Sequence, residues 1–180
     1  MFYLVPVDPV PAAIIEERES HYDVHGATEP DMVRDLNAKG PVVGAGHYWA
    51  YTSANVNFNY RTRQAHGACF LVSPSVVVSI NIVYPQWMPS APPTAAAASK
   101  WAKLDRAIHA HEGEHAQLAR EQARSLVRLL RRHVSGKTCK ALDTVVERES
   151  VILRQKSVMA NEALDERTGH GLKEGVAISW

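Results

Sequence analysis

Two histidines four residues apart, with a glutamate directly after the first, are the side chains of this sequence best suited to metal chemistry. The run is His111-Glu112-Gly113-Glu114-His115, which matches the pattern HExxH. Residues four apart lie on one face of an α-helix, so both imidazoles can bind one ion, and zinc binds such nitrogens at about 2.0–2.1 Å. A carboxylate beside the first histidine can then activate water at the metal. The run therefore predicts a catalytic zinc site.

Helical spacing does not decide which glutamate would be the general base. Glu112 and Glu114 flank the histidine pair almost symmetrically, each about 80° from the mean direction of the two histidines. The established mechanics of the motif favour Glu112, which would take a proton from water and pass it to the leaving amine. Glu114 would then support the ligands or lie on the surface. His109 points to the opposite face of the helix, so we exclude it as a ligand.

A catalytic zinc usually has three protein ligands and one open position, so a third ligand must come from elsewhere in the chain. The close extension of the motif, with a histidine six residues after His115, is absent because position 121 is Glu. Three candidates remain: Glu149 on an apolar stripe, His170 in a glycine-flanked loop, and Asp165. For Glu149, an ion pair with Lys156 is an equally good interpretation.

A long helix is needed to carry the motif, and the apolar pattern predicts one from about residue 94 to residue 133. A second helix is predicted from about residue 137 to residue 165. On the first helix, five apolar residues lie within about 60° of His111. They are Leu104, Ile108, Leu118, Leu126 and Leu129. Both histidines of the motif therefore lie on the buried stripe, where dry surroundings strengthen electrostatic interactions.

A sheet is predicted before the two long helices. Residues 47–51 and 56–60 alternate between polar and apolar, and residues 68–72 and 76–84 are rich in β-branched or aromatic types. A further strand is expected at 21–26, followed by a short helix that Thr28 caps and Gly40-Pro41 stops. We expect an α+β fold with a small antiparallel or mixed sheet of three to five strands packed on the two long helices. Residues 1–20 would form an extended lead-in and residues 21–180 a single domain.

Composition excludes several classes of partner. The net charge is +1 over 180 residues, with no dense block of Lys and Arg, which argues against nucleic acid or an anionic membrane. No window of about 20 apolar residues exists, so no transmembrane segment is expected. The N-terminal segment lacks the basic start of a signal peptide, so an exported protein would be in its mature form here. Cys69 and Cys139 fit either one disulfide or two free thiols.

With these residues assembled, the chain resembles the predicted secreted zinc-dependent proteases classed as domain-of-unknown-function family 922, in the zincin-like metallopeptidase clan. The resemblance covers nearly the whole chain from Tyr22 onward. It rests on short motifs and single residues: Tyr22-Asp23-Val24-His25-Gly26, Gly40-Pro41, Trp49, Cys69, Pro85-Gln86-Trp87, the HEGEH run, Cys139, and the C-terminal Asn161, Asp165, Thr168, His170-Gly171 and Gly175.

The resemblance implies a zinc metallopeptidase of zincin-like fold that hydrolyses peptide or protein substrates. It assigns His111 and His115 as ligands, Glu112 as the base and His170 as the third ligand. Glu149 and Asp165 remain the alternatives for the third ligand that the residues themselves offer. It also implies a Cys69–Cys139 disulfide and a periplasmic or secreted location. We expect the substrate to lie along an edge strand at about residues 76–83.

Three positions depart from the family pattern, and the one at Leu164 motivates an alternative function. Leu164 stands where the family usually has Tyr, and Glu174 and Val176 stand where Gln and Ala are expected. If that tyrosine stabilises an oxyanion, this member is slower or uses another donor. The alternative function is a non-catalytic exported binding module that contains zinc, and a third is hydrolysis of a non-peptide amide such as a cell-wall crosslink.

Overall fold

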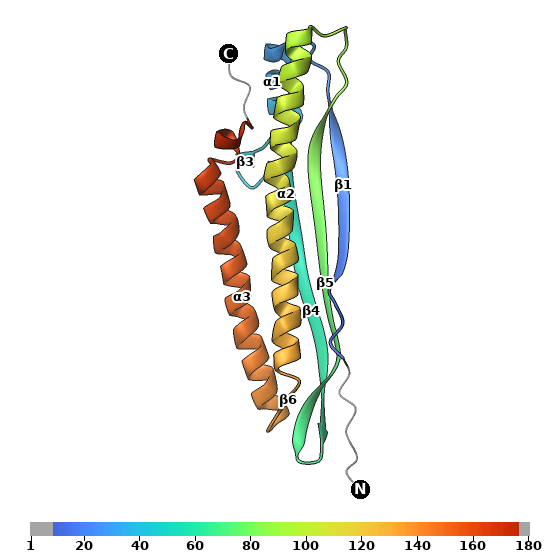
Figure 1. Cartoon of the computed structure of the whole chain (residues 1–180), viewed down its shortest axis with the longest axis vertical. Helices are drawn as coiled ribbons and strands as arrows, with labels where there is room; N and C mark the ends of the chain where they lie inside the picture. The colour runs from blue at the N-terminus through green and yellow to red at the C-terminus, as the bar shows by residue number, and fades with distance from the viewer. Residues whose placement is uncertain (1–8, 177–180) are drawn as a thin grey trace. The chain divides into compact units, whose positions relative to one another are not determined.

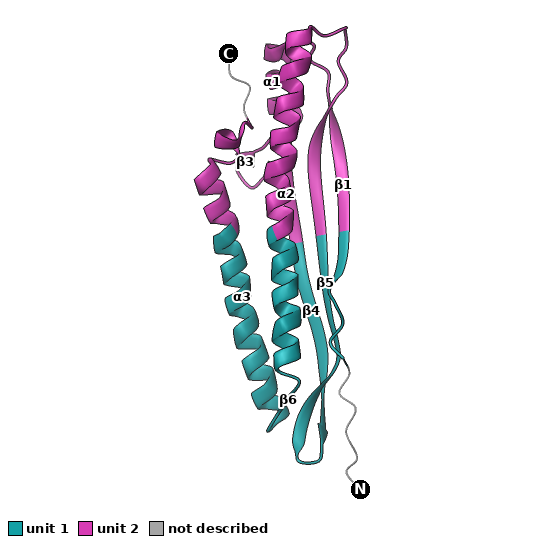
Figure 2. Cartoon of the chain, in the orientation of Figure 1, with its two compact units in different colours: residues 1–16, 55–79, 118–160 teal, residues 17–54, 80–117, 161–180 magenta. Residues whose placement is uncertain are grey.

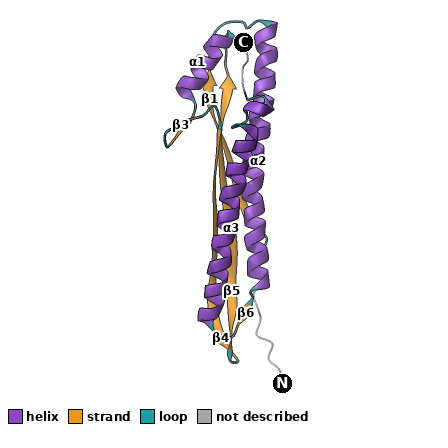
Figure 3. Ribbon diagram, turned by 90° about the vertical axis from the view of Figure 1, so that its left-hand side faces the viewer, coloured by secondary structure: helices purple, strands orange, loops and turns teal. Residues whose placement is uncertain are grey.

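The computed structural model describes residues 9–176. The parts of the expected lead-in and C-terminal tail at residues 1–8 and 177–180 lie outside the described residues. The elements follow one another as β1 (Ile14–Val24), α1 (Glu29–Lys39), β2 (Val42–Val43), β3 (Gly46–His47), β4 (Tyr51–Ala65), β5 (Ala68–Trp87), α2 (Ala95–Arg132), β6 (Ser135–Gly136), α3 (Cys139–Thr168) and the 3-10 helix η1 (Leu172–Glu174) (Figure 1). Figure 3 shows the helices and strands in separate colours.

The fold is α+β, as the sequence predicts, with the sheet order β1–β5–β4 and with β6 paired to β5. The four short strands expected between residues 47 and 84 are instead two long ones, β4 and β5. His66 and Gly67 join them with φ angles of 48° and 75°, the left-handed backbone that a two-residue hairpin turn requires. Met88 N donates to Val24 O, and Ser20 Oγ donates to Ile82 O. The contact of Ser20 with Ile82 is followed by that of Val24 with Met88, so the chain advances in the same direction along both strands. β1 therefore runs parallel to β5, and the sheet is mixed.

A bulge in β5 explains its length and its burial pattern. Cys69 and Leu71 are buried at odd positions, whereas the buried residues from Pro74 to Tyr84 are at even positions. The change of phase occurs at Ser73, whose φ of 52° marks an extra residue in the strand. One apolar face therefore stays buried along the whole strand. Because β5 is the central strand of the sheet, the expectation that residues 76–83 form an edge strand is wrong.

The chain divides into two compact units (Figure 2). Unit 1 contains Met1–Glu16, Asn55–Ser79 and Leu118–Ala160, and unit 2 contains Glu17–Ala54, Ile80–Gln117 and Asn161–Trp180. Each long strand and helix gives one part to each unit. β1 begins at Ile14, within the segment expected to be an extended lead-in. Within the described residues, no helix is long and apolar enough to cross a membrane.

Unit 1 is crosslinked by the disulfide between Cys69 and Cys139. The bridge joins the first turn of α3 to the start of β5, next to the two residue pairs that β6 forms with β5. This confirms the expected link between the sheet and the second long helix.

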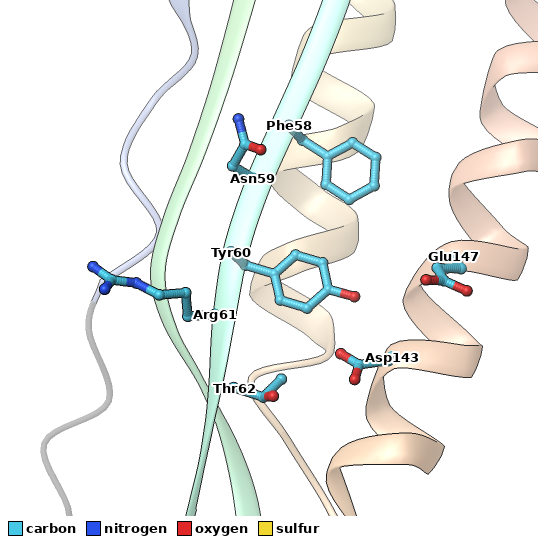
Figure 4. A pocket seen from close by; sticks show the side chains of 7 residues that line it. All are labelled: Phe58, Asn59, Tyr60, Arg61, Thr62, Asp143 and Glu147. Atoms are coloured by element: carbon cyan, nitrogen blue, oxygen red, sulfur yellow. The ribbon is translucent and has the colours of Figure 1, made fainter.

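An open cleft lies between β4 and α3 in unit 1. The parallel rings of Phe58 and Tyr60 point from β4 toward Asp143 and Glu147 on α3 (Figure 4). Burial, together with the charge of Asp143 and the hydrogen bond to it, raises the pKa of Tyr60 to about 12.

In unit 2, several residues of the family pattern hold backbone segments in place. Tyr22 Oη donates to Trp49 O at 2.6 Å, and Trp87 Nε1 donates to Gly26 O at 2.8 Å. A Cβ at Gly26 would lie 2.3 Å from Met32 N, so only glycine lets the loop after β1 pass so close to α1. These contacts give the N-terminal motif and the two tryptophans structural roles.

Candidate metal centre

Three ligand atoms converge in unit 2. His115 Nε2 lies 3.3 Å from His111 Nε2 and 3.1 Å from Asp165 Oδ1, and His111 Nε2 lies 3.4 Å from the same oxygen. Both histidines come from α2 and the aspartate comes from α3. Such a group of two imidazoles and one carboxylate can hold a metal ion.

The sequence places the two histidines on the inner face of α2. Leu104 and Ile108 are each 1% exposed, and His111 follows on the same stripe at 5%. Leu126 and Leu129 are also buried, whereas Leu118 is only half-buried. The i, i+4 spacing then brings His115 beside His111, with ring centroids 4.9 Å apart. The histidine side chains are 6% and 13% exposed, so little water reaches the nitrogens.

Each histidine also has a partner for its other ring nitrogen. His111 Nδ1 lies 3.0 Å from Glu174 Oε2, and His115 Nδ1 lies 2.7 Å from Asn161 Oδ1. Because both partners are oxygen acceptors, each Nδ1 carries a hydrogen and donates it. In a neutral imidazole this leaves the Nε2 lone pair facing Asp165 and the other histidine.

The distances between the three ligand atoms fit a zinc ion. Tetrahedral donors at about 2.0–2.1 Å from zinc are about 3.3–3.4 Å from one another. The three observed separations are 3.3, 3.4 and 3.1 Å. Moreover, two Nε2 lone pairs and a carboxylate oxygen repel one another unless a proton or a cation lies between them. The residues present therefore fit the metal that the sequence motif predicts.

Burial separates the two glutamates that helical spacing leaves equivalent. Glu112 is 6% exposed, and within the described part of the chain its carboxylate has no hydrogen bond or ion pair. Glu114 is 49% exposed and forms a 3.0 Å ion pair with Arg167. A carboxylate in such largely buried surroundings is expected where it has a function, whereas an exposed ion pair contributes little. Thr52 Oγ1 of β4 donates to Glu112 O at 3.2 Å, which places the start of β4 beside the motif.

A tight turn after α3 packs against His111. Thr168, 3% exposed, accepts a hydrogen bond from Gly171 N and donates one to Leu164 O. Gly171 has a φ of 80°, and a Cβ there would lie 2.5 Å from Val176 Cγ2 and 3.3 Å from His111 Cγ. Only glycine therefore fits between the turn and the imidazole.

The three candidates for third ligand have different surroundings. Asp165 is in the cluster, as described above. His170 lies outside the cluster on the turn, with a 65% exposed side chain whose Nδ1 is 3.6 Å from Asp165 Oδ1. Glu149 is in unit 1, where it pairs with Arg132 at 3.1 Å and His133 at 3.2 Å and not with Lys156. His109 is directed elsewhere, with its ring stacked on Tyr84 at a centroid distance of 4.1 Å.

Two residues at the site, Asn161 and Glu174, have no role that the sequence alone predicts. Asn161 belongs to the C-terminal pattern, and Glu174 departs from it. Their positions give a usable signal: Asn161 and Asp165 are four residues apart, so they share one face of α3 just as the histidines share one face of α2.

Comparisons with known proteins identify the family. No curated protein and no solved structure matches the chain. A family model described as "Bacterial protein of unknown function (DUF922)" matches residues 19–171, which includes the HEGEH run, Asn161, Asp165 and His170. The chain belongs to this family of bacterial proteins.

Proposed function

We propose that the protein is a zinc-dependent metallopeptidase. The observation that carries the proposal is the convergence of three metal-binding atoms from His111, His115 and Asp165. Glu112, next to the first of them in the chain, is largely buried and its carboxylate has no partner among the described residues. A site built only to hold a metal has no need of a further, largely buried carboxylate beside its ligands. General acid–base catalysis does need one.

In this proposal His111, His115 and Asp165 hold the zinc, and Glu112 moves the proton. When bound, zinc acts as a Lewis acid that polarises the scissile carbonyl and lowers the pKa of water. Glu112 takes a proton from the attacking water and gives it to the leaving amine. Glu174 and Asn161 accept hydrogen bonds from the two histidines, and the apolar face of α2 limits access of bulk water.

The substrate would bind as an extended peptide along β4. This strand is at one end of the sheet order, so its outer edge can pair with a further strand. Thr52, near its start, contacts the backbone of Glu112. A peptide paired with residues 51–54 would therefore pass beside the base. The substrate would bind at β4 and not at β5, because β5 is the central strand of the sheet.

His170 would contact the substrate in this proposal. Its side chain is 65% exposed at the rim of the cluster, and the edge of its ring meets Tyr48 at a centroid distance of 6.4 Å. An exposed imidazole at this point can donate a hydrogen bond to a carbonyl oxygen, which offers a replacement for the tyrosine that Leu164 lacks. Leu164 itself is 4% exposed and carries no donor.

We also propose that the protein works outside the cytoplasm, in the periplasm or secreted. The Cys69–Cys139 disulfide supports this location because such bonds persist in oxidising compartments.

Exchange of each glutamate of the motif for glutamine tests the activity. The zinc-loaded wild type and the two variants would be compared on a library of quenched fluorescent peptides, with bound zinc measured in each. We expect Glu112→Gln to lower kcat/KM by about 10²–10⁴-fold at unchanged zinc content. The matched control Glu114→Gln, which removes only a surface ion pair, should stay within about twofold. Full activity of Glu112→Gln would exclude Glu112 as the base.

One observation favours the competing function, a non-catalytic zinc-containing module. His170 Nδ1 is near enough to Asp165 that a rotation of the side chain could bring it to the remaining coordination position and close the site. Titration of the cobalt-substituted protein with acetohydroxamate separates the two functions. A change in the cobalt absorption spectrum indicates an open position, and an unchanged spectrum together with no cleavage of any peptide indicates the closed module.

A further inference from the structure

The C-terminal segment provides the partners for both metal-binding histidines. Glu174 lies in η1 and Asn161 near the end of α3, and their side-chain oxygens are 3.0 and 2.7 Å from the Nδ1 atoms of His111 and His115. Both histidine side chains are largely buried. Water therefore cannot easily replace either acceptor.

We propose that Glu174 and Asn161 are positioning residues, which hold both histidines in the Nδ1–H tautomer before the metal binds. With each Nδ1 donating, both Nε2 lone pairs face the metal position and the rings cannot turn away from it. The inference rests on the proposed metal site. It goes beyond that site because it assigns a large part of the metal affinity to two residues that do not touch the metal.

The backbone holds both acceptors rigidly. Backbone hydrogen bonds fix the turn that carries Glu174. Glu174 N and Val176 N both donate to Gly171 O, and Gly175 N donates to Leu172 O. Gly171 and Gly175 both have left-handed backbones, with φ of 80° and 97°, which lets the chain make this short turn. Asn161 is one helical turn before Asp165, so one face of α3 offers a ligand and an acceptor together.

The two acceptors differ in charge, since Glu174 is a carboxylate and Asn161 a neutral amide. The family resemblance leads to Gln at position 174, which can accept the same hydrogen bond without a charge. A carboxylate accepts a stronger hydrogen bond and makes the imidazole a better donor to the metal. A neutral acceptor only weakens this hydrogen bond, whereas loss of the acceptor removes it. Loss of the acceptor should therefore weaken zinc binding more than loss of the charge.

Zinc affinity, measured by competition with a chromophoric chelator, tests the inference without reference to catalysis. We expect Glu174→Ala and Asn161→Ala each to weaken zinc binding by about 10–100-fold. Glu174→Gln, which keeps an acceptor, should recover most of the affinity. Glu162→Ala is the matched control, because Glu162 is an exposed acidic residue next to Asn161 and should leave the affinity unchanged.

Nitrogen-15 NMR of the metal-free protein gives the second measurement. The wild type and Glu174→Gln should show a single Nδ1–H tautomer for His111, and Glu174→Ala a mixture of tautomers. Wild-type affinity and an unchanged tautomer in Glu174→Ala would overturn the inference while leaving the peptidase proposal intact. A wild-type protein that binds no zinc would overturn both. Thermal unfolding of each variant shows whether it folds, and the conservative Glu174→Gln still reports on the tautomer if Glu174→Ala does not.

Discussion

Replacement of Asp165 by alanine should remove metal binding, whereas replacement of His170 should not. Asp165 Oδ1 lies 3.1 and 3.4 Å from the two Nε2 atoms, so Asp165→Ala leaves only two donors, both on one helix. His170 is outside this cluster and 65% exposed, so His170→Ala leaves all three donors in place. Alanine is the best helix former, so α3 should stay intact in Asp165→Ala.

The size of the effect follows from linkage between binding and folding. Loss of a residue that only orients a ligand weakens metal binding by about 10–100-fold, so loss of a ligand should cost at least about 100-fold. At a zinc concentration about 1,000 times the wild-type Kd, zinc stabilises the fold by about 4 kcal/mol, and a 100-fold weaker site leaves about 1.4 kcal/mol. For a chain of this size the zinc-induced rise in Tm should therefore be smaller by about 5–10 °C in Asp165→Ala.

Differential scanning fluorimetry with and without zinc, together with chelator competition, checks these values. His170→Ala should match the wild type within about threefold in Kd. The opposite ranking, with zinc lost in His170→Ala and kept in Asp165→Ala, would refute the assignment of Asp165 and return the third ligand to His170. Metal analysis of the purified protein adds an independent check, because two histidines and one carboxylate also suit iron(II), and bound iron in place of zinc would contradict a hydrolytic site.

Further predictions concern the disulfide, two glycines and a tyrosine. The double variant Cys69→Ser with Cys139→Ser should lose about 4 kcal/mol of unfolding free energy in urea titration, since the bridge closes a loop of 70 residues. An unchanged midpoint would show that the bridge does not constrain the unfolded chain. Gly171→Ala should cost at least about 2 kcal/mol, because it needs a left-handed backbone and collides with Val176. Gly113→Ala, with open space at its Cβ, should instead gain up to about 1 kcal/mol, and equal effects would contradict the packing described for the turn. Ultraviolet titration should show a tyrosine ionising near pH 12 that disappears in Tyr60→Phe. Because the unfolded chain loses this proton first, near pH 10, stability should fall as the pH rises from about 10 to 12.

The sequence predicts the helices of this protein well because their signals are local. Periodic apolar residues set the limits of the two long helices within a few positions, and Thr28 and Gly40 mark the ends of α1, as predicted. The strands were harder to predict. A bulge at Ser73 lets β5 continue for 20 residues, and no local pattern shows that two short apolar runs belong to one strand.

The order of the strands depends on contacts between distant residues. The parallel pairing of β1 with β5 makes β5 central, which could not be inferred from the composition of residues 76–83. The same limit applies to the third ligand. Asp165 and His170 are five residues apart on either side of a helix end, and only the turn at Gly169–Gly171 decides which of them faces the histidines.

The family pattern contains two kinds of residue, and the structure separates them. Tyr22, Gly26 and Trp49 form contacts that hold backbone segments, and Cys69 and Cys139 form the crosslink. Asn161 and Asp165, by contrast, are directed at the histidines of α2. Two of the three departures in this chain, Leu164 and Glu174, fall close to the second group. Leu164 precedes Asp165 but is directed into the core. Leu in place of Tyr therefore removes a hydrogen-bond donor and leaves the three metal-binding residues in place. Glu174 contacts His111 directly and adds a negative charge there.

If the metal centre works as proposed, the exchange at position 174 should alter metal affinity and the exchange at position 164 should alter turnover. Measuring both quantities in Leu164→Tyr and Glu174→Gln separates the two contributions, and a change in zinc affinity in Leu164→Tyr alone would contradict this division.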